Sequence, residues 1–238
     1  MIQELRLYLA LTGAAVISSK LSELVAAKKS RVILALDAVD ERPAGVVEEV
    51  EEFVVGVKVG LPLVLKWGLE EVEYLLDRFR GSLYMLCDFK LADVPPIVVD
   101  ELKLIKRMGF DGAIIHLFQG GIEEVASARE RPELFGLVAM THGGSVLIDQ
   151  HFRELVETAL RAGLEGCVVP ATKPHIIKAV RELAPDKLLL SPGVGAQGAP
   201  FGSAIRAGAD FEIVGRAITA SADRRSSAKA ARDATYML

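Results

Sequence analysis

One pattern occurs eight times along the chain: an apolar run, a polar turn and then an amphipathic stretch. Short apolar runs rich in Val, Ile and Leu are typical of parallel strands that helices cover on their outer side. These runs lie at residues 31–36, 53–59, 83–87, 112–115, 134–140, 166–169, 187–190 and 209–214. Eight βα units in one chain predict an α/β fold, the (β/α)8 barrel.

The amphipathic stretches predict the helices of this barrel. They lie at residues 43–52, 62–80, 95–108, 121–129, 149–161, 173–183, 200–207 and 217–231. A doubly wound open sheet is the structural alternative, and it usually carries a glycine-rich fingerprint after its first strand. Residues 37–40 are Asp-Ala-Val-Asp, which is not such a fingerprint. Because no linker interrupts the pattern, we expect residues 1–238 to form a single (β/α)8 TIM-barrel domain.

The N-terminus lies outside the eight units. Thirteen residues from 7 to 19 carry no charge, which is too few to span a bilayer. A signal peptide would begin with a basic segment, but Glu4 and Arg6 cancel each other. We therefore expect a helix over about residues 2–28, within an N-terminal helical extension at 1–30, that caps the barrel floor or joins an interface. The expected location is the cytoplasm.

Charge and cysteine usage exclude several classes of function. The net charge of −4 provides no basic field for nucleic acid. Cys87 and Cys167 lie inside apolar runs and are expected to be buried, reduced thiols. The four histidines lack the close spacing of a zinc site, and His116 and His142 are the nearest candidates for a metal ligand. We expect no metal site.

The string Asp88-Phe89-Lys90-Leu91-Ala92-Asp93 follows the third apolar run. Ionisable side chains are rare at the end of a buried strand unless they have a role there. Because side chains two apart in a strand share a face, Asp88 and Lys90 are expected to point the same way. An ammonium beside a carboxylate is a plausible proton donor with a neighbouring anion. The alternative is an ion pair in a loop.

Other polar side chains occur at the same ends of the expected strands. They are Asp37, Lys58, Asp88, Lys90, His116, Thr141, His142, Gln197 and Arg216. Barrel enzymes build their active sites at the carboxyl ends of the strands. The shared position of these residues therefore predicts an active site at this end of the barrel.

A second signal lies in the last two units. Residues 192–198 form the glycine-rich turn Pro-Gly-Val-Gly-Ala-Gln-Gly, and Gly215-Arg216 precedes the final helix. Phosphate groups often bind barrels between the loops after strands seven and eight, and an arginine fork suits phosphate oxygens. These residues predict a phosphate site, with a flexible loop and a surface arginine as the alternative.

Five segments are similar, in the same order, to those of the orotidine 5′-phosphate decarboxylase family. They are Ala35-Leu36-Asp37, Val57-Lys58-Val59-Gly60, Asp88-Phe89-Lys90-Leu91-Ala92-Asp93-Val94-Pro95, Ser191-Pro192-Gly193-Val194-Gly195-Ala196-Gln197-Gly198 and Ile213-Val214-Gly215-Arg216. The resemblance extends from about residue 31 to 220. It implies a carboxy-lyase that converts orotidine 5′-phosphate (OMP) to uridine 5′-phosphate (UMP) and CO2 in de novo pyrimidine biosynthesis, without a cofactor.

The resemblance also implies roles for individual residues. The catalytic set would be Lys58, Asp88, Lys90 and Asp93, with Lys90 giving a proton to C6, Asp88 near the departing CO2 and Asp93 reaching across a homodimer into the partner's site. The substrate-binding set would be Asp37 at the ribose, Thr141 at the pyrimidine, and Pro192, Gln197, Gly215 and Arg216 around the phosphate.

The chain departs from the family pattern at two places. Ile97 stands where a threonine hydroxyl is expected, and Gly143-Gly144 replaces a Pro-Gly pair, which predicts a looser loop after the fifth strand. Two other functions stay open at this point. A Mg²⁺-dependent decarboxylase of keto-sugar acid phosphates would need an acidic metal ligand where this chain has Lys58, and a non-catalytic barrel would bind the nucleotide without turnover.

Overall fold

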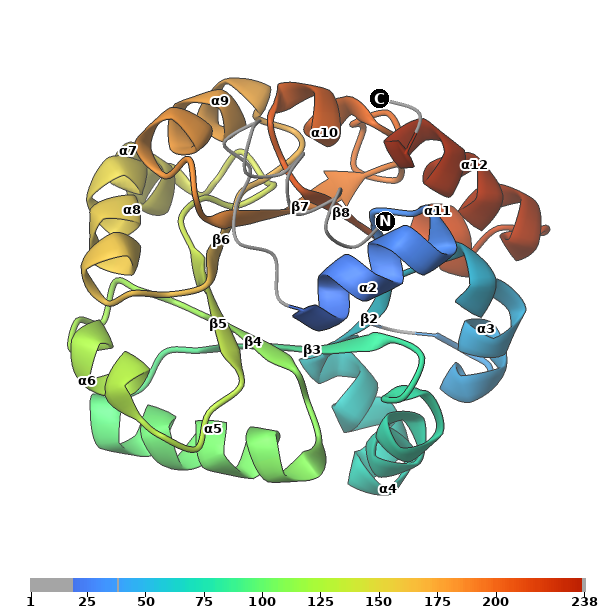
Figure 1. Cartoon of the computed structure of the whole chain (residues 1–238), viewed down its shortest axis with the longest axis horizontal. Helices are drawn as coiled ribbons and strands as arrows, with labels where there is room; N and C mark the ends of the chain where they lie inside the picture. Colours follow the sequence, from blue (N-terminus) through green and yellow to red (C-terminus); the bar gives the residue numbers. More distant parts are fainter. Residues whose placement is uncertain (1–18, 38, 237–238) are drawn as a thin grey trace.

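The computed structural model describes residues 19–37 and 39–236 and contains a closed barrel of eight parallel strands in chain order (Figure 1). The strands are β1 Val32–Leu36, β2 Gly56–Gly60, β3 Tyr84–Leu91, β4 Gly112–Ile115, β5 Glu133–Leu137, β6 Gly166–Val168, β7 Leu188–Val194 and β8 Phe211–Val214. Because β1 pairs with both β2 and β8, the sheet has no open edge. The predicted (β/α)8 barrel is confirmed, and the open doubly wound sheet is excluded.

All the described helices except the first, which lies across one end, form a ring around this barrel (Figure 1). The helices are α2 Ser19–Lys28, α3 Pro43–Val50, α4 Leu61–Phe79, α5 Pro95–Met108, α6 Ile122–Ser127, α7 Val146–Gln150, α8 Phe152–Arg161, α9 Pro174–Leu183, α10 Ser203–Ala207, α11 Arg216–Thr219 and α12 Arg224–Tyr236, with a 3-10 turn, η1, at Glu51–Phe53. Proline occupies the first turn of α3, α4, α5 and α9, where its missing N–H removes no helical hydrogen bond.

Several boundaries differ from those that the sequence predicts. β3 continues to Leu91 and β7 continues to Val194. Both strands run past the ends of their apolar runs into polar residues and, in β7, a proline, so the apolar pattern alone places their ends too early. The helix expected at 149–161 is two helices that meet at His151. The helix expected at 217–231 is likewise divided into α11 and α12.

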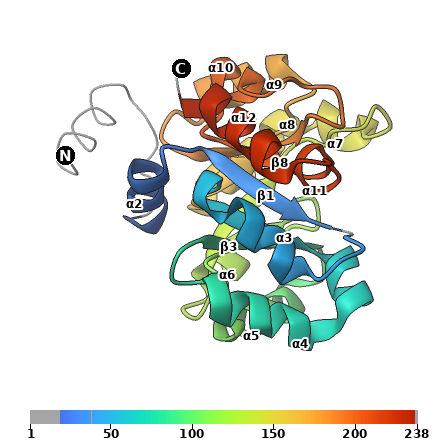
Figure 2. The same cartoon turned by 90° about the vertical axis from the view of Figure 1, so that its right-hand side faces the viewer.

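Helix α2 covers the end of the barrel at which the strands begin (Figures 1 and 2). Leu21 and Val25 are buried against the apolar residues inside the barrel. Lys20 Nζ lies 2.6 Å from Asp111 Oδ2, just before β4, and Lys28 Nζ donates to the Glu51 carbonyl at 2.7 Å. The rest of the predicted N-terminal helix lies outside the described residues. Within the described ranges, no helix is long and apolar enough to cross a membrane.

The barrel interior is filled by large side chains that pack beside glycines. Tyr84 of β3 and Phe135 of β5 are fully buried near the floor. Gly112 of β4 lies between them, and a Cβ atom there would stand 2.5 Å from Tyr84 Oη and 3.0 Å from the Phe135 ring. The large side chains of β3 and β5 thus fill the space that the glycine of β4 leaves, which gives a packed floor.

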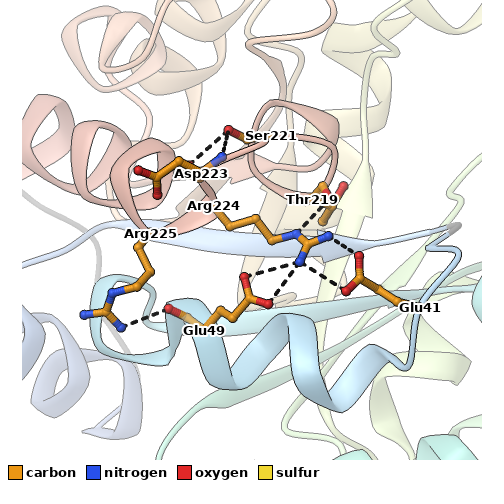
Figure 3. Close-up of polar contacts among 7 residues, drawn as sticks. All are labelled: Glu41, Glu49, Thr219, Ser221, Asp223, Arg224 and Arg225. Atoms are coloured by element: carbon orange, nitrogen blue, oxygen red, sulfur yellow. Dashed lines mark hydrogen bonds and ion pairs between the residues drawn. The ribbon is translucent and has the colours of Figure 1, made fainter.

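An arginine joins the last unit of the barrel to the first (Figure 3). Arg224, at the start of α12, bonds both carboxylate oxygens of Glu41 and lies 3.0 Å from Glu49 Oε1 of α3. Its Nε donates to the carbonyl of Thr219 at 3.1 Å. The neighbouring Arg225 donates to the Glu49 carbonyl at 3.3 Å. Arg224 therefore connects α3 and the segment before it to the end of α11.

Replacing this arginine should loosen the connection between the two ends of the chain. We expect Arg224→Ala to lower the free energy of unfolding by about 1 kcal/mol and the melting temperature by roughly 2–4 °C, since it removes several charge-assisted hydrogen bonds at once. Urea denaturation measures the first quantity. Lys103→Ala, which removes an exposed pair with Asp100 on α5, is the control and should change stability by less than about 0.5 kcal/mol. Equal losses of unfolding free energy in the two variants would contradict the conclusion that Arg224 holds the two ends of the chain together.

Candidate active site

A cavity of about 220 Å³ opens at the end of the barrel where the strands finish. Nine of the residues that the sequence selects line it: Asp37, Lys58, Asp88, Lys90, Thr141, Pro192, Gln197, Gly215 and Arg216. The sequence reasoning missed the apolar residues that form its base and walls, among them Ala35, Ile114, Leu137, Val168 and Ile213. Strand alternation would have identified some of them, because Ile114 lies two residues after Gly112 and Leu137 lies two residues after Phe135, on the same inner face.

The charged side chains on one side of this cavity come from the ends of three neighbouring strands, β1, β2 and β3. Val57 and Val59 of β2 pack in the layer between strands and helices, so Lys58 between them points inward. Asp37 directly follows β1, and Asp88 lies opposite Gly60 in the β2–β3 register. The pairing of the first three strands therefore brings Asp37, Lys58 and Asp88 together.

The charged groups form a chain of alternating sign. Lys58 Nζ lies 2.6 Å from Asp37 Oδ1 and 2.9 Å from Asp88 Oδ2. The other oxygen of Asp88 accepts a hydrogen bond from Lys90 Nζ at 2.8 Å. Each inner member of the series Asp37–Lys58–Asp88–Lys90 thus has a partner of opposite charge on both sides.

Burial divides this series into an enclosed pair and two open ends. The side chains of Lys58 and Asp88 are 6% and 8% exposed, whereas those of Lys90 and Asp37 are 39% and 54% exposed. Burial by itself would lower the pKa of Lys58, but the charges of Asp88 and Asp37 raise it above the ordinary value. Burial would raise the pKa of Asp88, but Lys58 and Lys90 lower it. Both buried groups are therefore ionised at neutral pH.

Lys90 has an unusual backbone conformation. Its φ of 50° lies in the left-handed region, which costs a non-glycine residue about 1–3 kcal/mol. The β3–β4 register also shifts between Cys87 and Leu91. Asp88 and Lys90 do meet as predicted, but a bulge in β3 directs Lys90, and simple strand alternation does not explain the contact.

Gly60 leaves the space that Asp37 occupies. A Cβ atom on Gly60 would stand 2.0 Å from Asp37 Oδ1 and 3.4 Å from Lys58 Nζ. Any side chain at this position would displace the Asp37 carboxylate. The end of β2 therefore requires glycine for the Asp37–Lys58 contact to form.

The opposite side of the cavity consists of backbone turns and one cation. Three glycines have positive φ here, Gly193 near the end of β7 and Gly195 and Gly198 in the turn that follows it. Gly198 N donates to the Gly195 carbonyl at 2.8 Å. The exposed Arg216 lines the cavity from the start of α11. Because α11 is only four residues long, the guanidinium and not a long helix supplies the positive charge here. This side can accept an anion such as phosphate.

Asp93 does not line the cavity of its own chain. It is exposed after β3, and one of its carboxylate oxygens accepts a hydrogen bond from the Val94 amide at 2.6 Å. Partial burial, with a smaller contribution from the charge of Asp93, raises the pKa of the nearby Glu101.

The two histidines near this end are not arranged as metal ligands. His116 is partly buried, and its pKa is lowered by desolvation and then by the charge of Lys90. His142 is exposed on the loop after β5. Over residues 19–37 and 39–236, no group of three or more His, Cys, Asp or Glu side chains is placed to hold a metal ion.

The sequence of this chain is similar to one family of known proteins. Residues 30–231 match the family described as orotidine 5′-phosphate decarboxylase / HUMPS. The chain is 34% identical to orotidine 5′-phosphate decarboxylase of Thermoplasma acidophilum over 85% of this chain and 94% of that protein. It is 38% identical to the enzyme of that name from Methanococcoides burtonii over 85% and 95%.

Solved structures of enzymes with this name also have a fold similar to that of this chain. The crystal structure of orotidine 5′-monophosphate decarboxylase from Sulfolobus solfataricus matches with a TM-score of 0.78 and 29% identity, over 87% of this chain and 97% of that one. The enzyme from Methanocaldococcus jannaschii, complexed with the inhibitor BMP, matches with a TM-score of 0.77 and 29% identity, over 87% and 98%.

The close approach at Gly60 can be tested by stability. We expect Gly60→Ala to lower the free energy of unfolding by about 1–3 kcal/mol, because the methyl group overpacks the site and pushes Asp37 away from the buried Lys58. Urea denaturation measures the change. Gly45→Ala in α3 is the matched control, since a Cβ there meets no atom within 4 Å, and it should leave stability unchanged or raise it by up to about 1 kcal/mol. An unchanged free energy of unfolding in Gly60→Ala would refute the conclusion that a methyl group at this position displaces Asp37.

Proposed function

The chain belongs to the orotidine 5′-phosphate decarboxylase / HUMPS family, and we propose that it is a carboxy-lyase that converts OMP to UMP and CO2 in pyrimidine biosynthesis. The observation that carries this proposal is the Asp37–Lys58–Asp88–Lys90 series at the cavity. Two free cysteines buried in the barrel suit the reducing interior of a cell, and the cytoplasm is the location that belongs to this proposal.

The chemistry demands stabilisation of negative charge. Loss of CO2 from the pyrimidine leaves a carbanion at C6 with no adjacent electron sink, so preorganised positive charge has to lower the barrier. Lys90 is the cation of the series that is open to the cavity, and in this proposal it faces C6 and then gives it a proton. Asp88 lies next to the substrate carboxylate and holds Lys90 in place.

The rest of the cavity suits the remainder of the nucleotide. In this proposal Asp37, which is half exposed, contacts the ribose, and Thr141 contacts the pyrimidine. The turn after β7, with Pro192 and Gln197, surrounds the phosphate together with Gly215 and Arg216. Binding of the distant phosphate supplies energy for alignment of the reacting part of the substrate.

Lys58 separates this reaction from the metal-dependent reaction within the same family. A keto-sugar acid phosphate decarboxylase would hold Mg²⁺ with a carboxylate at the end of the second strand. Here that position is a buried ammonium whose pKa is raised by Asp88 and Asp37 against the effect of burial, so it stays positively charged and repels a cation. The proposed reaction therefore proceeds without a metal ion.

We also propose that the enzyme is a homodimer in which Asp93 enters the partner's cavity. Large apolar side chains are exposed around the end of the barrel where Asp93 lies. They are Leu61, Leu65, Val94, Ile97, Phe118, Val146 and Leu147. Ile97, which replaces the expected threonine, belongs to this surface and adds apolar area to it. Such a surface is uncommon on monomeric proteins and fits a symmetric interface.

The test of the activity follows the ultraviolet absorbance of OMP with purified protein in excess EDTA. Loss of OMP with formation of UMP and CO2 is the expected result. Tight UMP binding without turnover would favour the non-catalytic barrel. Absence of both, with turnover of a keto-sugar acid phosphate after addition of Mg²⁺, would favour the metal-dependent reaction.

Lys90→Ala should abolish decarboxylation, because it removes both the cation beside C6 and the proton donor. UMP binding should stay measurable, since the ribose and phosphate contacts are unchanged. Absorbance assays and calorimetry measure the two quantities. Lys103→Ala on the outer surface is the control and should leave turnover unchanged. Turnover of Lys90→Ala near that of the parent would overturn the role of Lys90.

Mixing two variants tests the role of Asp93 across the interface. A dimer of one Lys90→Ala chain and one Asp93→Ala chain contains one intact site if Asp93 acts on the partner, and none if it acts within its own chain. An equal mixture of the two slow variants, unfolded and refolded together, should therefore recover about a quarter of the parent activity. No recovery, with mixed dimers present by mass spectrometry, would contradict the proposal.

A further inference from the structure

The loop that carries Thr141 is held from the neighbouring loop, between β6 and α9. Thr172 Oγ1 donates to the carbonyl of Thr141 at 3.0 Å. Lys173 Nζ donates to the carbonyls on either side, at 2.8 Å to Met140 and 3.1 Å to His142. Three consecutive carbonyl groups around Thr141 are thus bonded by two side chains that adjoin each other in the sequence.

The ammonium of Lys173 has two further partners on the same loop. It lies 3.1 Å from Ser145 Oγ and forms an ion pair with Asp149. The other oxygen of Asp149 accepts a hydrogen bond from the Met140 amide at 3.2 Å, and Ser145 Oγ lies 2.6 Å from Asp149. We call Lys173, Ser145 and Asp149 the Lys173 clamp. It fixes both the amide and the carbonyl of Met140, the residue before Thr141.

The Lys173 clamp is partly buried and strongly paired. The side chains of Lys173 and Asp149 are 17% and 18% exposed. Burial acts to raise the pKa of Asp149, but hydrogen bonds from Lys173, Ser145 and the Met140 amide lower it, so the carboxylate is ionised at neutral pH. Lys173 stands at the start of α9, where its carbonyl accepts from Ile176 N at 2.9 Å. The cation is therefore anchored on a regular helix.

The members of the Lys173 clamp do not line the cavity, whereas Met140 and Thr141 do. Thr141 also packs on the turn at the phosphate side. A Cβ atom on Gly193 would stand 2.9 Å from Thr141 Cγ2 and 3.1 Å from Gln197 Oε1. The backbone position of Thr141 therefore decides where its hydroxyl lies relative to both ends of a bound nucleotide.

The clamp acts on a loop that its own sequence leaves unrestrained. Gly143 and Gly144 follow directly after the fixed carbonyl of His142, and glycine pairs have high conformational entropy in the absence of tertiary contacts. The looser loop expected from the missing proline is thus tied at both ends by Lys173, through Met140 and His142 before the glycines and Ser145 after them.

We infer that Lys173, Ser145 and Asp149 are positioning residues, which hold the Thr141 hydroxyl against the pyrimidine ring of the substrate. This inference rests on the proposed decarboxylation of OMP, in which Thr141 contacts the base. The three residues touch no substrate atom and act through the backbone of residues 140–142.

A double-mutant cycle tests whether Lys173 acts through Thr141. Lys173→Met removes the charge and keeps the length of the side chain, and we expect it to lower kcat/KM for OMP about tenfold by misplacing the hydroxyl. In a Thr141→Val background the same change should cost less than about twofold, because the hydroxyl is already absent. A tenfold loss in both backgrounds, or no loss in the parent, would overturn the inference.

The control is Lys178→Met, an exposed lysine on the same helix, which should leave kcat/KM unchanged. If Lys173→Met fails to fold, Asp149→Asn takes its place in the cycle. Amide hydrogen exchange of Met140, whose N–H donates to Asp149 Oδ1 at 3.2 Å, gives a readout that does not depend on activity. Exchange should accelerate about tenfold in Lys173→Met and not in Lys178→Met. Unchanged exchange would overturn the inference, whereas a parent enzyme that fails to decarboxylate OMP would overturn only the proposed function.

Discussion

The arrangement of the cavity depends on the ion pair between Lys58 and Asp88. Both side chains are less than 10% exposed, at 6% and 8%, and loss of either partner would leave the other buried charge with only one counterion, at the more exposed end of the series. Asp37 and Lys90 complete the pairing at the two ends. Because Lys58 and Lys90 lower the pKa of Asp88 against the effect of burial, ionised Asp88 adds stability above the ordinary pKa of 3.8, and this stability is lost as the pH falls through the lower folded value.

The barrel meets the requirements of this pair in specific ways. The β2–β3 register sets Asp88 opposite Gly60, and the absent side chain of Gly60 makes room for Asp37. The bulge in β3 turns Lys90 toward Asp88 at the expense of a left-handed backbone. The large residues on the floor fill the barrel interior below the cavity. A cation that is fixed by buried neighbours, yet open to a cavity, is what carbanion chemistry without an electron sink requires.

Much of this arrangement could be predicted from the sequence, because eight repeated units determine the barrel and its parallel strands bring their carboxyl ends together. The bulge in β3 could not be predicted, because it depends on how β3 pairs with β4 and not on the local alternation of side chains. Asp93, which the resemblance assigns to the partner's site in a homodimer, does not line the cavity of its own chain, and its role stays a prediction. No sequence motif points to Lys173, because its partners lie 24 to 33 residues away along the chain. They become its neighbours only when β5 and β6 pair.

The most direct test of the central ion pair is an NMR titration of the Asp88 carboxyl carbon in the folded protein, assigned by comparison with Asp88→Asn. If Lys58 and Lys90 outweigh burial, the carbon should stay in its ionised state as the pH falls and titrate below the ordinary value of 3.8, or not at all before the protein unfolds. A titration midpoint above 3.8 would mean that burial dominates, and it would contradict the ionised Asp37–Lys58–Asp88–Lys90 series on which this account of the active site rests.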